Sequence, residues 1–397
     1  MGVKFDKTFQ ISTTALYWNL GHPSIPVTLK WVIKMLIFYV LYFFITMIYS
    51  SIYYDSFSRI CTNLGLAAVF GIISFNYTIL IVYKKRFIQM MRIVEEDLER
   101  SSELNIEDEI VVRGYTAKGR KVTKYWLNVC IICDGFICKP VLGTTYFALT
   151  SNFTLVPIHE LTYPTNLEER KNEFDMYLLI IAFQLFYVLL SSLMYVGFNP
   201  LGPIFIMHAC GQMDLAIRQV RRLFLENNIK IEERIRRLRD IVRLVQNIYS
   251  FVDQIQETHK LLFEMYLKTS TVVIPISCFG IIESYHEGNL SLDLIGYVFA
   301  CYTQCFIPCY YCEFLLSKGE EFRNAIYSCG WERYWGSRSR SMILLMLTRT
   351  ARPLRIHALF SIVCFEAFAN LTRTMSLSIS FFFIMNGLTH GHGLAEA

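Results

Sequence analysis

Long apolar runs alternate with charged stretches along this chain. Four runs of about 20 or more residues carry no charge, and three further runs are nearly as apolar. A bilayer core takes about 20 apolar residues per helix, so the pattern predicts an all-α integral membrane protein with seven transmembrane helices. The predicted spans are 35–54, 60–83, 125–150, 176–207, 269–285, 294–312 and 365–387.

The charged stretches between the spans also have helical periodicity. Over 84–104 and 229–268, apolar residues recur three and four positions apart among basic and acidic ones, which is typical of amphipathic helices. These helices either pack together beside the membrane or lie on anionic lipid, and we favour packing. Within the fourth span, Asn199-Pro200 predicts a kink or break, because proline lacks an N–H and restricts the residue before it.

The distribution of basic residues predicts the orientation. Of the 38 Lys and Arg residues, 33 fall on one side of the predicted spans and 3 on the other. Basic residues favour the cytoplasmic side, so the N-terminus is expected to be cytoplasmic and the C-terminus extracellular. The sequon at Asn152 then lies outside and is a candidate glycosylation site.

Composition and motifs indicate which chemistry to expect. Hydrophobic residues make up 54% of the chain and charged residues 18%, and we find no carboxylate pair, Ser/His arrangement or phosphate loop. We therefore expect no enzyme activity, no cofactor and no nucleic-acid partner; membrane lipid is the expected surroundings. Asp134 and Lys139 lie inside the third span, where charges are costly and often functional. The alternative is structural, with each pairing to another helix or reaching the interface.

The last span carries a polar stripe. At 100° per residue, one face collects polar residues at its start and apolar residues toward its end. We expect this face to line a pore that closes at a hydrophobic constriction. The alternative is that its first polar residues join the cytoplasmic packing and never meet ions. The stripe comprises Glu366, Asn370, Arg373, Leu377, Ser380, Phe381 and Ile384.

The C-terminal third resembles a known family. From residue 302 the chain reads "YTQCFIPCYYCEFLLSKGEEFRNAIYSCGWERY", and "TRTARPLRIHALF" and "FEAFANLTRTMSLSIS" follow. These segments resemble the C-terminal part of insect odorant receptors. "HACGQMDLAIRQV" at 208–220 fits the same family. The shared features are Gln304, Cys309, Cys312, Ala325, Tyr327, Trp331, Arg349, Pro353, Leu354, Phe368, Arg373, Thr374 and Ser376.

The resemblance implies a function and an organisation. Members are subunits of a heterotetrameric, odorant-gated, nonselective cation channel that forms with the odorant receptor co-receptor in the plasma membrane of olfactory sensory neurons. The implied segments are a cytoplasmic N-terminus (1–30), helices 1–4 with the ligand-binding bundle (31–207), a cytoplasmic anchor segment (208–268), helices 5–6 (269–316), a second anchor segment (317–355), pore-lining helix 7 (356–388) and an extracellular tail (389–397).

A volatile odorant needs an apolar, aromatic pocket with few polar groups. In the outer halves of the spans, the candidate ligand-binding residues are Phe70, Ile73, Phe136, Tyr146, Phe183, Phe186, Tyr187, Phe279 and Tyr297. Two alternatives stay open. A gustatory-type receptor channel is a close one, and a secondary transporter would use Asp134, Lys139 and Arg373 as coupling charges.

Overall fold

The fold was examined in a computed structural model, which describes residues 4–26, 28–35, 49–52, 57–150, 155–158, 161, 163, 165–226, 230–286, 288, 292–333, 337–377 and 380. Within these residues the chain is helical apart from turns, connections and one isolated bridge between His357 and Ile362. Residues 365–377 form the last described helix, called here the C-terminal helix. The other elements are α1 (Phe5–Thr8), α2 (Gln10–Trp18), α3 (Leu29–Met35), α4 (Tyr49–Ile52), α5 (Phe57–Val82), α6 (Lys84–Ser101), α7 (Ile106–Cys133), η2 (Asp134–Cys138), α8 (Lys139–Leu149), α9 (Thr165–Arg170), α10 (Phe174–Phe198), α11 (Leu201–Leu225), α12 (Ile231–His286), α13 (Leu292–Tyr327), η3 (Trp331–Arg333) and α14 (Ser337–Thr350).

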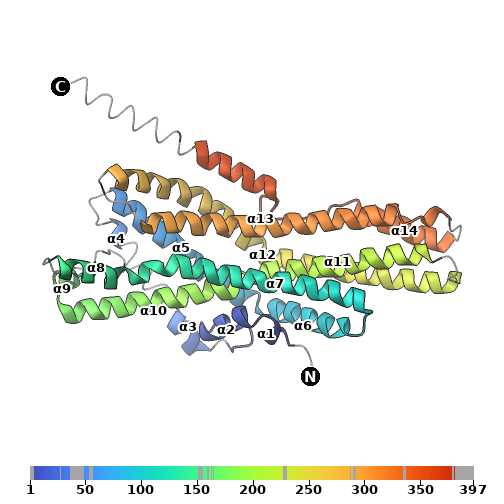
Figure 1. The fold of residues 1–397 in the computed structure, drawn as a ribbon, viewed down its shortest axis with the longest axis horizontal. Coiled ribbons are helices and arrows are strands. Elements are labelled where there is room, and N and C mark those ends of the chain that lie inside the picture. Colours follow the sequence, from blue (N-terminus) through green and yellow to red (C-terminus); the bar gives the residue numbers. More distant parts are fainter. Residues whose placement is uncertain are drawn as a thin grey trace, which may run out of the picture.

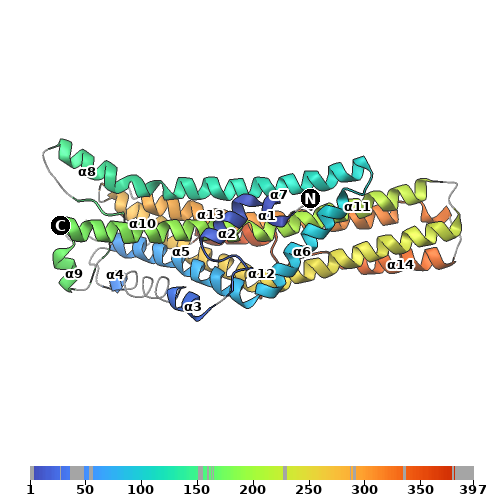
Figure 2. The ribbon, with the colours of Figure 1, turned by 90° about the horizontal axis from the view of Figure 1, so that it is seen from below.

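The long helices run along one axis and form an elongated bundle (Figures 1 and 2). The elements α4, α8 and α9 lie toward one end, and α14 lies at the other with the last turns of α11 and the first turns of α12. At 1.5 Å per residue, α12 is about 84 Å long, which far exceeds the roughly 30 Å of a hydrocarbon core. Within the described residues, the stretches Phe174–Leu225 and Ile231–Tyr285 are long and apolar enough to cross a membrane.

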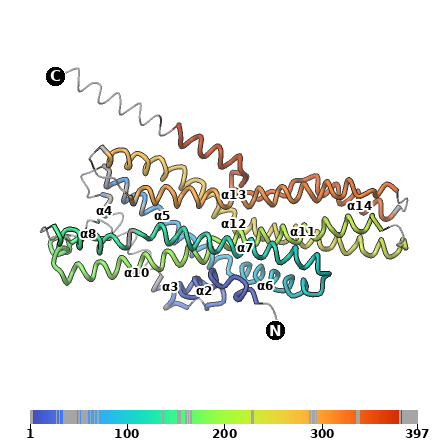
Figure 3. Tube along the Cα trace, viewed as in Figure 1, coloured from blue at the N-terminus to red at the C-terminus, as the bar shows by residue number. Residues whose placement is uncertain are grey.

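The helix pair α10 and α11 is interrupted at Asn199-Pro200, where a break was predicted. The helix α10 ends at Phe198, and α11 begins at Leu201. Both intervening residues keep right-handed helical backbone angles, with φ −61° and ψ −33° at Asn199. The chain therefore passes from α10 to α11 through a turn of nearly helical geometry, and Figure 3 shows one continuous course.

The amphipathic stretches predicted beyond the spans pack against other helices. Phe87, Met90 and Val94 on the apolar face of α6 are buried, as are Ile241 and Val245 on α12. These side chains belong to a single large core that also takes in α5, α7, α11 and α13. Burial of such faces is the main source of helix stability in water, so the charged segments extend the bundle.

Ionic contacts join three helices in this extension. Arg222 on α11 pairs with Asp108 on α7 at 2.7 Å, and Lys318 on α13 lies 3.4 Å from Asp214 on α11. The Tyr115 hydroxyl donates to Asp214 at 3.5 Å. Burial and the neighbouring Asp214 carboxylate raise the pKa of Tyr115 to about 12. The hydroxyl is therefore a donor at every physiological pH, which suits the contact with Asp214.

A buried polar node joins α5, α10 and α12 at the Asn-Pro break. The Tyr266 hydroxyl lies 3.1 Å from Asn76 Oδ1 and 3.0 Å from Asn199 Oδ1. Asn76 Nδ2 also lies 3.5 Å from Asn199 Oδ1. All three side chains are buried. Because unpaired amides are costly inside a protein, these bonds fix how the three helices lie against one another.

The N-terminal helices pack into the bundle. Phe5, Phe9 and Leu16 are buried in its core, and the Ser12 hydroxyl donates to the Gly197 carbonyl on α10. A Cβ at Gly197 would lie 2.7 Å from Leu16 Cγ, which is closer than side chains tolerate. The absence of a side chain at Gly197 is what lets α2 lie directly on α10.

We predict that Gly197→Ala destabilises the protein by about 1–3 kcal/mol through overpacking, although alanine is the better helix former. The measurement is the thermal unfolding of the detergent-solubilised protein. Gly114→Ala on α7 is the matched control, because a Cβ there meets nothing within 4 Å. Equal or higher stability of Gly197→Ala would contradict this contact.

Candidate ligand cavity

A cavity of about 850 Å³ lies between α7, η2, α8, α10 and the first turns of α13. Its volume is within the 300–1,000 Å³ range of small-molecule sites. Val129, Leu142, Val188 and Ile295 are among its apolar wall residues, and Trp126 closes it toward the polar node. The other lining residues are Cys130, Ile132, Cys133, Asp134, Gly135, Lys139, Gly143, Phe147, Val156, Ser191, Ser192, Tyr195, Leu292, Gly296, Tyr297, Phe299, Ala300 and Gln304.

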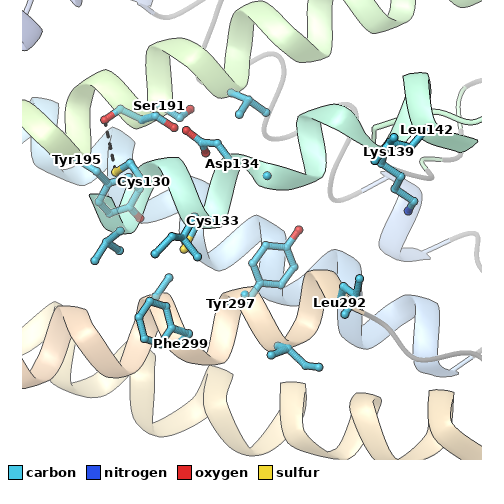
Figure 4. A pocket seen from close by; sticks show the side chains of 18 of the residues that line it. Cys130, Cys133, Asp134, Lys139, Leu142, Ser191, Tyr195, Leu292, Tyr297 and Phe299 are labelled. Carbon is cyan, nitrogen blue, oxygen red and sulfur yellow. Dashed lines mark hydrogen bonds between the residues drawn. The ribbon is translucent and has the colours of Figure 1, made fainter. Parts of the chain in front are cut away.

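A break in the third predicted span shapes one wall. α7 ends at Cys133, the 3-10 helix η2 follows, and α8 begins with Lys139 and Pro140. Proline cannot donate to the preceding turn, and a 3-10 turn is tighter than an α-turn, which redirects the side chains along it. Figure 4 shows the result: Asp134 points toward Ser191 on α10, and Lys139 lies apart from it beside Leu142.

A second glycine contact brings a connection onto the cavity. A Cβ at Gly143 on α8 would lie 2.8 Å from Val156 Cγ2, so only glycine permits this approach. The Val156 carbonyl accepts a hydrogen bond from the Tyr177 hydroxyl at 2.8 Å. This bond holds the connection between α8 and α10, and Val156 contributes to the wall.

The predicted ligand-binding residues are distributed unevenly around this cavity. Tyr297 lines it, with its ring among the α13 wall residues (Figure 4). Tyr187 is buried, but its neighbour Val188 is the lining residue, and Phe147 lines the wall next to the 63% exposed Tyr146. Ile73 is buried in the core on α5, and α5 contributes none of the lining residues found in the described part of the chain.

Three further predicted residues lie away from the cavity. Phe183 and Phe186 are 41% and 47% exposed on the outer surface of α10, and Phe279 is half-buried on α12. The side chains of Phe70 and Phe136 and the whole of Asn152 lie outside the described residues. A ligand-binding role stays a prediction for each residue of the set.

Of the lining residues found in the described part of the chain, only Tyr297 had been predicted as a ligand contact, and Trp126, Tyr195 and Gln304 are among those missed. Trp126 and Gln304 are almost fully buried and line both the cavity and a small void beside Tyr266. Tyr195 lies on the cavity face of α10. The only feature of the sequence that drew attention to Gln304 was its place in the pattern shared with odorant receptors. Trp126 lies at the start of the third predicted span, directly after a basic stretch, and this position did not indicate a ligand contact.

The C-terminal helix presents the predicted polar stripe on its open side. Glu366, Asn370, Arg373, Leu377 and Ser380 are exposed, whereas Leu371 and Met375 pack into the core. No hydrogen bond or ion pair of the Glu366, Asn370 or Arg373 side chains is found within the described residues. Phe381 and Ile384 lie outside them. The stripe is therefore available to water or to another subunit.

The hydroxyls of this helix need no external partner. Thr372, Thr374, Ser376 and Ser380 each donate to the carbonyl four residues earlier, a bond that serine and threonine form readily in helices. The hydroxyl run therefore gives no support for a pore by itself. That support comes from the exposed Glu366, Asn370 and Arg373.

Two carboxylates hold the start of the C-terminal helix. Glu313 on α13 accepts from the Phe365 N–H at 3.2 Å, at the helix N-terminus where an anion is favourable. Glu264 on α12 accepts from the Phe360 N–H and the Ser361 hydroxyl, each at 3.2 Å. The Phe368 ring packs on Phe306 of α13, with centroids 5.3 Å apart. The first turns are thus fixed to α12 and α13, and beyond them the helix tilts away from α13 (Figure 1).

Comparisons with known proteins identify a family and a fold. The sequence profile of the family described as 7tm Odorant receptor matches residues 56–375. The insect olfactory receptor OR5 from Machilis hrabei in complex with eugenol has a TM-score of 0.71 at 13% identity, covering 96% of this chain and 97% of that one. A second structure of the same Machilis hrabei receptor has a TM-score of 0.63 at 16% identity, covering 96% of both chains. At these identities the likeness shows the fold. No match is found among curated protein sequences.

We predict that Gly296→Leu blocks ligand binding in the cavity. A Cβ at Gly296 meets nothing within 4 Å, so leucine extends into the open volume and improves helix propensity. The measurement is thermal stabilisation of the purified protein by a panel of small apolar compounds, where a ligand at a hundred times its Kd contributes about 2.7 kcal/mol. Gly114→Leu is the control and should retain the stabilisation. Undiminished stabilisation of Gly296→Leu would exclude this cavity as the site.

Proposed function

The chain belongs to the odorant receptor family of multi-pass membrane proteins, and from this we propose that it is the odorant-binding subunit of an odorant-gated cation channel. A volatile ligand binds in the cavity between α7, α10 and α13, and binding opens a pore lined by the C-terminal helix. The observation that carries the proposal is the cavity itself: it is large enough for a small molecule, mostly apolar, and has few polar groups.

The helix α13 supplies the connection between ligand and pore. Its first turns, including Tyr297 and Gln304, form a wall of the cavity. Its next turns carry Phe306 and Glu313, which contact the C-terminal helix. A ligand shifts an equilibrium only through different affinities for the two states. A ligand that favours a displaced α13 would therefore favour a displaced C-terminal helix.

The proposed pore wall is the exposed stripe from Glu366 to Ser380. Its polar start suits a water-filled vestibule, and Leu377 at 64% exposure begins an apolar section that continues in the sequence to Phe381 and Ile384. Hydrophobic constrictions of this kind gate by dewetting. A groove of about 640 Å³ beside the stripe is lined by Lys268, Glu313, Arg355 and neighbouring residues, and it gives an adjoining subunit a surface to occupy.

The proposed partner is the odorant receptor co-receptor, in a heterotetramer. The proposed location is the plasma membrane of olfactory sensory neurons, with a cytoplasmic N-terminus, an extracellular C-terminus and a glycan on Asn152. In this arrangement the packed extension formed by parts of α6, α7, α11, α12, α13 and α14 lies in the cytoplasm and forms the anchor between subunits. The high density of charged residues there supports this placement.

The test of this function is electrical recording from cells that express the chain with and without the co-receptor. We expect odorant-evoked cation current only with both chains and with a reversal potential near zero. Saturable substrate flux without conductance would instead identify a transporter. A current that responds to non-volatile tastants and not to odorants would identify a gustatory-type channel.

We predict that Leu377→Ala raises the basal current of the co-expressed channel, because a smaller side chain widens and wets the proposed constriction. Phe381→Ala tests the same gate one turn further along. The matched control is Leu179→Ala on α10, which is 63% exposed, is not a lining residue of the cavity and is distant from the stripe in sequence. Unchanged leak current in both gate variants, at equal surface expression, would count against this constriction.

A further inference from the structure

The cavity wall contains a carboxylate that has unused hydrogen-bonding capacity. Asp134 lies in η2, is half-buried and lines the cavity. The Ser192 side chain on α10 lies close enough to its carboxylate to interact with it. A carboxylate offers about four acceptor positions, and no ion pair of Asp134 is found within the described part of the chain. Several acceptor positions are therefore open to a donor inside the cavity.

The groups around Asp134 do not fill these positions. The Ser191 hydroxyl donates to the Tyr187 carbonyl of its own helix at 2.8 Å. The Cys130 thiol is directed to the Ser192 carbonyl at 3.9 Å. Lys139 is five residues away and lies apart from Asp134 at the Leu142 side of the cavity (Figure 4). The Ser191 hydroxyl and the Cys130 thiol are thus used within the protein.

A carboxylate in an apolar wall discriminates between ligands. Its negative charge is costly in this setting unless a donor or a cation meets it. A ligand hydroxyl or ammonium supplies that contact, and hydrogen bonds to charged groups are the strong ones. A ketone, ester or ether brings only acceptor oxygens, which the carboxylate repels, and leaves the charge unpaired. The surrounding Val129, Val188 and Ile295 accept an apolar body in either case.

We propose that the ligands of this cavity are small apolar molecules that carry a hydrogen-bond donor, a hydroxyl or an ammonium group, bound by Asp134. This inference rests on the proposed function of the cavity as the odorant site. It adds a chemical class to that function, because acceptor-only odorants of the same size are then poor ligands.

The experiment compares octan-1-amine, octan-1-ol, octan-2-one and octyl methyl ether, which share a similar apolar chain. Binding is measured by thermal stabilisation of the purified protein, and activation by current in the co-expressed channel. We expect the amine or the alcohol to act at concentrations at least tenfold below those of the ketone and ether. Asp134→Asn should reduce this preference tenfold or more and leave the ketone response unchanged.

Controls and variants separate the possible outcomes. Asp175→Asn removes an exposed carboxylate from the other end of α10 and should change nothing. A larger loss for the amine than for the alcohol in Asp134→Asn identifies an ammonium ligand, and equal losses identify a neutral donor. If Asp134→Asn does not fold, the order of the four compounds on the unmodified protein still decides the inference.

Two failures are distinguishable. If none of the four compounds binds, or if their binding survives Gly296→Leu, the cavity is not the ligand site and both the proposed function and this inference fall. If binding requires the open volume at Gly296 but donor and acceptor compounds act equally, or Asp134→Asn changes nothing, the cavity remains the site and the assignment to Asp134 is wrong.

Discussion

The hydrogen bonds among Asn76, Asn199 and Tyr266 set the arrangement on which the rest of the bundle depends. They lie at the interruption between α10 and α11. The positions of α5, α10 and α12 along one another are therefore fixed at the point where this long apolar stretch is interrupted. If one of these helices slid along its neighbours, an amide or a hydroxyl would lose its hydrogen bond in the core. That loss costs free energy, whereas apolar side chains have no hydrogen bond to lose. The cavity lies on one side of this node and the charged extension on the other. Trp126 and Gln304 lie between the node and the cavity.

The extension and the cavity are built from the same helices. The helices α12 and α13 each join the charged part of the chain to the apolar part as one helix, with Pro275 inside α12 and Pro308 inside α13. Such helices transmit displacement along their axis because each residue is held by its own backbone bonds. Ion pairs among α7, α11 and α13 then fix their charged ends. Movement at the cavity is therefore constrained at the far end, whereas the stripe from Glu366 to Ser380 on the C-terminal helix is exposed.

The sequence predicted the helical class, the Asn-Pro interruption and the membrane character because these follow from long apolar runs and from backbone chemistry. It did not identify the cavity face of α10, because that helix is apolar all round and periodicity then carries no information on orientation. Phe183 and Phe186 were selected as aromatic residues in the outer half of this helix, and they are 41% and 47% exposed. The break at Gly135 and Pro140 was also missed: the prediction treated 125–150 as one span, although these two residues were its signal. Trp126 and Gln304 depend on contacts between distant segments that a single sequence does not reveal.

Neighbouring turns of α13 line the cavity and contact the C-terminal helix, and this affects how variants of such a receptor are interpreted. Gln304 belongs to the cavity wall, and Phe306, two residues later, packs on the C-terminal helix. In the proposed channel, substitutions in this stretch would alter the strength of binding and the ease of opening together, so a change in half-maximal concentration would not report affinity alone. The same coupling links two inherited properties. In the proposed channel, drift in α13 that retunes the odour spectrum would also reset spontaneous firing, whereas drift in α8 or at Val156 would change the spectrum with the opening equilibrium left in place.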